Sequence, residues 1–140
     1  MPRWEDLREG MELPPLEKTP TSDTARAYFG SWRVGMPAFF DREAARRQGL
    51  PDTIVPGPLK LSFMAQMVQR WAGPGAFVRS GRAAHRRPDF AGRTMRVRGT
   101  VARVYQQDDR HLADVELWIE NAEGERTSTG AVTVELREQA

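Results

Sequence analysis

The spacing of hydrophobic and polar positions changes near the middle of this 140-residue chain. Between Pro58 and Trp71, apolar residues recur at helical spacing and cover most of the circumference, which predicts one long buried helix over residues 58–72. Beyond residue 94, apolar residues alternate with polar ones in three segments: 95–101, 115–120 and 132–137. A period of two is typical of strands with one covered face. Turn-forming residues at 107–110 and 121–124 connect the three segments as successive antiparallel hairpins.

The N-terminal half has shorter elements. Residues 7–16 contain two prolines and no helical period, which predicts extended chain. Residues 21–23 offer capping oxygens to a helix that ends near Phe29, and Asp41 offers one to a second helix over 42–48, with a shaped loop between the two helices. A half-apolar antiparallel sheet can cover its apolar face by wrapping around the long helix. The sequence therefore predicts an α+β protein, a single hot-dog domain spanning residues 1–140.

Composition removes several classes of chemistry. The chain has no cysteine, so disulfides, thiolate nucleophiles and sulfur-bound zinc are excluded, and we expect no metal and no resident cofactor. No apolar run is long enough to span a bilayer and the N-terminus does not resemble a signal peptide, so we expect a cytoplasmic protein with no membrane contact. The only two histidines are His85, among arginines, and His111, beside a hairpin turn where we expect it to be exposed.

Positive charge is concentrated in one segment. Nine arginines lie between residues 70 and 103 against a single acidic residue, Asp89, so this segment carries a net charge of +8 and the rest of the chain −6. Such a segment can bind phosphate, or it can be a solvated arginine-rich face. The tryptophans do not have the spacing of a base-stacking platform, so we do not expect nucleic-acid binding.

Five stretches in order, residues 4–15, 40–51, 54–59, 69–74 and 86–92, resemble the MaoC-like family of R-specific enoyl-CoA hydratases. The run Ile54-Val55-Pro56-Gly57-Pro58-Leu59, for example, is similar to the family's I-x-H-G-x-L at the start of the central helix. The short length and the run 68–74 look most like the small, dyad-lacking subunit of heteromeric hydratases that act on steroid side-chain CoA thioesters. The resemblance implies a hot-dog fold and an acyl thioester of CoA or acyl carrier protein as ligand.

The sequence departs from the family where the catalytic loop should be. The family's loop reads D-x-N-P-x-H-x-D, and its first Asp and its His form the acid–base dyad that hydration requires. Aligned on Pro37 and Asp41, the chain has Val34 at the position of the Asp and Phe39 at that of the His. Neither side chain transfers a proton, and no histidine precedes residue 85, so no shift of the alignment restores the dyad. We therefore expect no catalytic residue of the family type.

Three functions remain open. The first is the non-catalytic half of a heteromeric 2-enoyl-CoA hydratase for a bulky apolar acyl group, with a MaoC-like partner supplying the dyad. The second is a homodimeric enzyme with other chemistry on a polyketide-like chain or a thioester, for which Asp41, Asp52 and Lys60 are weak candidates, Asp41 being better explained as a helix cap. The third is a binding module without turnover.

The resemblance also implies which residues contact the ligand. The substrate-binding set is apolar or small: Val34, Met36, Phe39, Phe40, Pro56 and Gly57. The candidates for the CoA phosphates are arginines, whose planar groups form strong bidentate contacts with phosphate: Arg79, Arg82, Arg86, Arg87 and Arg93.

Overall fold

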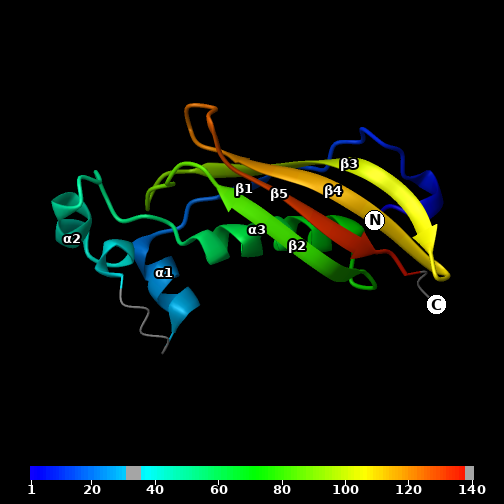
Figure 1. The fold of residues 1–140 in the computed structure, drawn as a ribbon, viewed down its shortest axis with the longest axis horizontal. Helices are drawn as coiled ribbons and strands as arrows, with labels where there is room; N and C mark the ends of the chain where they lie inside the picture. Colours follow the sequence, from blue (N-terminus) through cyan, green and yellow to red (C-terminus); the bar gives the residue numbers. More distant parts are fainter. Residues whose placement is uncertain (31–35, 138–140) are drawn as a thin grey trace.

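A curved antiparallel sheet wraps over one long helix, with two short helices gathered at one end (Figure 1). This computed structural model describes residues 1–30 and 36–137. The helices are α1 (Ser22–Phe29), α2 (Arg42–Arg47) and α3 (Gly57–Ala72), with two short 3-10 turns, η1 (Trp4–Asp6) and η2 (Pro37–Phe39). The strands are β1 (Leu16–Lys18), β2 (Phe77–His85), β3 (Met95–Gln107), β4 (Arg110–Glu120) and β5 (Arg126–Glu135). The predicted α+β hot-dog fold is confirmed.

The central helix α3 begins and ends where the sequence predicts. Pro58 occupies its first turn, where the missing N–H costs nothing, and Gly73 ends it with a positive φ of 96°. One face of the helix packs against the sheet and contributes Leu59, Phe63, Met64, Met67 and Val68 to the core. Leu61 and Trp71 are only half-buried, so the wide apolar stripe is covered by this chain on one side and partly exposed on the other.

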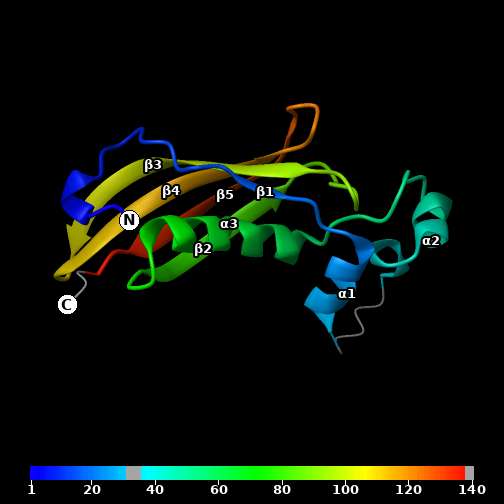
Figure 2. The same cartoon turned by 180° about the vertical axis from the view of Figure 1, so that it is seen from behind.

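The sheet has the order β1-β3-β4-β5-β2, and every neighbouring pair is antiparallel. The three predicted strand segments are β3, β4 and β5, and their apolar positions, such as Val97, Val115 and Val132, are fully buried against α3. Viewed from behind, α3 lies along the concave side of the sheet, and α1 and α2 lie beyond the N-terminal end of α3 (Figure 2). Both helices therefore lie at the end of α3 where the ligand site is expected.

Strand β2 was not among the predicted strands. Its nine residues pair with β5, but its sequence, Phe77-Val78-Arg79-Ser80-Gly81-Arg82-Ala83-Ala84-His85, shows no clean apolar alternation. The reason is its position, because an edge strand covers little of the core and can tolerate small and charged residues on both faces. None of the helices in the described parts of the chain is long and apolar enough to cross a membrane.

Candidate functional site

The N-terminal end of α3 lies against the last residue of β2. A Cβ atom on Gly57 would be 2.7 Å from Cδ2 and 3.0 Å from Nε2 of His85, so glycine lets the ring of His85 lie directly against the start of α3. Pro56 precedes the helix in an extended conformation. In the family sequence the imidazole belongs to the position of Pro56, whereas here an imidazole reaches the same helix end from β2.

His85 is held by a buried hydroxyl. Its Nδ1 lies 2.9 Å from Oγ of Ser128, which is fully buried on β5. Desolvation lowers the pKa of His85 below its usual value of 6.5, and the nearby positive charge of Lys60 lowers it further, while Asp89 acts in the opposite direction. This favours the neutral form of the ring, although the residue as a whole remains exposed.

A buried polar cluster lies behind this histidine. Lys60, one turn into α3, is 2% exposed, and its Nζ lies 2.8 Å from Oδ2 of Asp89, which is 5% exposed. The hydroxyl of buried Thr127 donates to the same carboxylate oxygen at 2.6 Å, and Lys60 also donates to the backbone oxygen of Arg87 at 3.3 Å. We call Lys60, Asp89 and Thr127 the buried charge cluster; it fixes the loop after β2 to the central helix.

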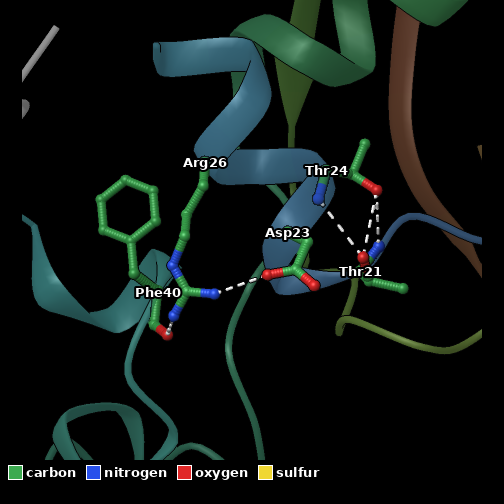
Figure 3. A network of polar contacts seen from close by, with 5 residues as sticks. All are labelled: Thr21, Asp23, Thr24, Arg26 and Phe40. Atoms are coloured by element: carbon green, nitrogen blue, oxygen red, sulfur yellow. Dashed lines mark hydrogen bonds and ion pairs between the residues drawn. The ribbon is translucent and has the colours of Figure 1, made fainter. Parts of the chain in front are cut away.

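A cluster of aromatic rings lies beside this helix end. Phe39 lies 5.6 Å from Phe29 and 6.2 Å from Phe40, measured between ring centroids. Arg26 of α1 holds the loop in place, since its guanidinium donates to the backbone oxygen of Phe40 at 2.8 Å and to Asp23 at 2.7 Å, as Figure 3 shows. α1 is itself anchored by a capping box between Thr21 and Thr24.

The predicted substrate-binding residues fall into two groups. Phe39, Phe40 and Met36 lie in or beside the aromatic cluster, and Met36 is 48% exposed. Pro56 and Gly57 lie at the start of α3. Val34 lies outside the described residues.

The weak catalytic candidates have other partners. Asp41 caps α2 by accepting from the backbone N–H of Glu43 at 2.9 Å. Asp52 accepts from the N–H of Thr53 at 2.7 Å, which lowers its pKa although burial opposes this, and pairs with Arg42 at 3.2 Å. Lys60 belongs to the buried charge cluster. Within residues 1–30 and 36–137, no three His, Asp or Glu side chains have the geometry of a metal site.

The five predicted phosphate-binding arginines are not gathered at one place. Arg79 pairs with Glu135 at 3.3 Å, and Arg87 pairs with Glu125. Arg93 lies over the ring of Phe90. Arg82 and Arg86 share a hollow on the outer face of the sheet together with Arg126, Glu116 and Trp118.

Sequence reasoning missed the two most constrained polar groups of the site. His85 was not expected to contact Gly57, and Lys60 was not expected to be buried. His85 gives only a weak signal, a lone histidine before an arginine pair. Lys60 gives a clearer signal, because it is a charged residue between the apolar residues Leu59 and Leu61 near the start of the predicted buried helix. His111, expected to be exposed, is half-buried and stacks on Trp4 with ring centroids 4.3 Å apart.

No family model and no curated protein matches the sequence. Solved structures do match the fold. The ChsH1-ChsH2 complex from Mycobacterium tuberculosis contains a chain that is 25% identical, with a TM-score of 0.81, covering 93% of this chain and 98% of that one. The (R)-hydratase of A. caviae involved in PHA biosynthesis is 21% identical, with a TM-score of 0.84 and coverage of 95% and 99%. The MaoC-like dehydratase of Rhodospirillum rubrum is 20% identical, with a TM-score of 0.79 and coverage of 97% of both chains.

A five-stranded antiparallel sheet curled over one central helix, shared along nearly the full length of these chains, defines a hot-dog protein. Within that class, the chain is similar in fold to hydratases and dehydratases that include a MaoC-like dehydratase.

Proposed function

We propose that this chain is the acyl-thioester-binding, non-catalytic subunit of a heteromeric 2-enoyl-CoA hydratase. The observation that carries the proposal is the apolar replacement of the family's catalytic loop. Phe39 stands where the family has its histidine, and its ring packs with Phe29 and Phe40. Adding water to a conjugated thioester requires an acid–base pair within reach of both the water and the α-carbon. In the proposed heteromer, a lyase of two unlike subunits, this acid–base pair comes from a MaoC-like partner. Support comes from the similar chain of the ChsH1-ChsH2 complex, which is itself an assembly of two named proteins.

The acyl group would lie against apolar side chains of this chain. Phe40 and half-exposed Met36 offer an apolar wall beside the start of α3. The first turn of any helix carries N–H groups without intrahelical partners, and these favour an electron-rich oxygen such as a thioester carbonyl. Gly57 carries no side chain at this helix end, where the ring of His85 lies against it. The combination favours a bulky apolar acyl chain over a short polar one.

The CoA phosphates would contact arginines near β2. Arg82 and Arg86 are exposed and make no ion pair within the described residues, so both are free to bind phosphate. Arg79 and Arg87 would first have to release their carboxylate partners. CoA enters as part of the substrate, so the proposal requires no resident cofactor.

The test is reconstitution. The chain should be purified alone and together with a MaoC-like protein that carries D-x-N-P-x-H and is encoded beside it. Hydration of a bulky 2-enoyl-CoA is then followed by the loss of its absorbance. We expect turnover only with both subunits present. Turnover by the chain alone at the rate of the pair would overturn the proposal. Phe40→Asp should weaken binding of the apolar substrate, whereas Arg47→Gln on α2 is a control with the same charge change of −1 away from the aromatic cluster.

His85 favours a second candidate function, chemistry by this chain alone. A neutral imidazole positioned against the start of α3 is the type of group that removes a proton in general base catalysis. A homodimer would then use His85 in place of Asp41, Asp52 or Lys60. His85→Gln should abolish any turnover by the isolated chain and leave partner-dependent turnover largely intact. If the isolated chain turns over no acyl thioester, this candidate falls.

A further inference from the structure

A hollow of about 580 Å³ lies at the C-terminal end of α3, away from the proposed acyl site. It is lined by the first residues of the chain, by Ala72 and Gly75 at the end of the helix, and by residues from β4 and the end of β5. Figure 1 shows the N-terminus at this end of the sheet, opposite α1 and α2. A helix rises about 1.5 Å per residue, so the length of α3 separates the hollow from Gly57 by roughly 20 Å. Its volume is within the range of about 300–1,000 Å³ that is typical of small-molecule sites.

Two stacked rings form one wall of this hollow. The indole of Trp4 and the imidazole of His111 lie 4.3 Å apart between centroids, with 11° between their planes. Trp4 is fixed because its Nε1 donates to the backbone oxygen of Leu112 at 3.1 Å. The backbone oxygen of His111 accepts from the N–H of Leu136 at 2.9 Å, and Leu136 also lines the hollow. The aromatic wall is therefore held in place by the protein itself, without a ligand.

Two arginines line the same hollow and have unused donors. Nε of Arg137 lies 3.2 Å from Oε1 of Glu135, and the Arg137 guanidinium lies over the ring of Phe77 at 5.6 Å. Nε of Arg3 lies 3.1 Å from Oδ2 of Asp6. Both ion pairs are made through Nε, so within residues 1–30 and 36–137 the Nη groups of the two arginines have no hydrogen-bond or ion-pair partner. Guanidinium N–H groups that are free in this way are well suited to bind a carboxylate.

We propose that this hollow binds a small organic anion built on a flat aromatic ring. Its carboxylate contacts the Nη groups of Arg137 and Arg3, and its ring lies against the wall of Trp4 and His111, because aromatic rings attract one another in stacked and edge-to-face arrangements. The charge of the hollow favours an anion, since Glu5 is the one acidic residue among the described residues that line it. The inference goes beyond the proposed hydratase role, because the site differs from the acyl site in both position and ligand.

The experiment titrates the full chain with 2-naphthoate in a calorimeter. We expect a dissociation constant below about 1 mM. The neutral 2-naphthalenemethanol should bind more weakly because it lacks the charge, and decahydro-2-naphthoate about fivefold more weakly because it lacks the aromatic ring. Arg137→Gln should weaken binding of 2-naphthoate about tenfold, the effect of losing a hydrogen bond to a charged group. Amide NMR shifts on binding should be largest at His111, Leu112 and Leu136.

Arg110→Gln is the matched control, because it makes the same charge change at an exposed position next to His111 that does not line the hollow. Circular dichroism checks that both variants keep the fold. The proposal is overturned if 2-naphthoate binds no more tightly than the two reference compounds, or if Arg110→Gln weakens binding as much as Arg137→Gln does. Shifts concentrated at the start of α3 would place the naphthoate in the acyl site and would also overturn it. None of these results affects the reconstitution assay, so the proposed hydratase role is tested separately.

Discussion

The buried charge cluster offers the sharpest test of how this domain is held together. Lys60→Met keeps the length and apolar stem of the side chain but removes the ammonium group 2.8 Å from Asp89. The carboxylate then remains 5% exposed with the hydroxyl of Thr127 as its side-chain donor. Removing one partner of a buried ion pair costs about 3–5 kcal/mol, because the remaining charge is left without compensation. A domain of this size has about 5–15 kcal/mol of stability in total, so the variant should be close to unfolding.

Urea unfolding followed by tryptophan fluorescence measures the loss, since Trp4 and Trp71 pack against the core. Lys18→Met is the matched control, because Lys18 is the only other lysine of the sequence. Its Nζ lies 5.2 Å from the centroid of the Phe63 ring, and loss of this contact should lower the free energy of unfolding by less than about 1 kcal/mol. The double variant Lys60→Met/Asp89→Asn removes both charges and should recover most of the stability. The reasoning is refuted if Lys60→Met costs no more than Lys18→Met, or if the double variant is no more stable than the single one.

Three other expectations concern the site. The pKa of His85 is lowered in the folded chain, so between its folded pKa and 6.5 the unfolded chain binds more protons than the folded chain. The free energy of unfolding should therefore fall as pH drops through this window. Urea unfolding of wild type and His85→Asn at several pH values measures this, because only the wild type should lose the stability that His85 contributes. Gly57→Ala should displace the ring of His85 and break its contact with Ser128, at a cost of about 0.5–1.5 kcal/mol, and in the same unfolding assay it should add little when His85 is already alanine. Arg26→Lys should lose the fork that joins the backbone oxygen of Phe40 to Asp23, lower stability by less than about 1 kcal/mol and speed proteolysis after residue 36. Unchanged proteolysis would contradict that role.

Periodicity was enough to predict the helix and the strands that form the core. α3, β3, β4 and β5 each bury one face, and burial is what imposes an apolar period on a sequence. β2 lacks that period because it is an edge strand, paired with β5 on one side only, and most of its side chains are not buried. Its Gly81 and Ala83 are small where the strand approaches α3, and small residues give little signal in a hydropathy pattern.

The ligand-contacting role of the apolar residues stays a prediction. Phe40 and Gly57 were chosen because they lie in stretches that resemble the family, and Phe39 because it stands where the family has its histidine. The pairing of Lys60 with Asp89 could not be predicted, since the two residues are far apart along the chain and both types are ordinarily found at the surface. The contact of His85 with Gly57 depends on how β2 docks beside α3, and it follows from the tertiary fold alone.

The unequal edges of the sheet also set a limit on growth. At the β1 edge only three residues of backbone are available to a further strand, so a chain approaching this side could form few ladder hydrogen bonds. Extension of the sheet from this edge is therefore disfavoured, which protects the protein from growing into fibres on that side without closing its sheet into a barrel. The length of the first strand is in this sense a protective feature, because a nine-residue strand such as β2 leaves a much longer row of backbone groups at its edge.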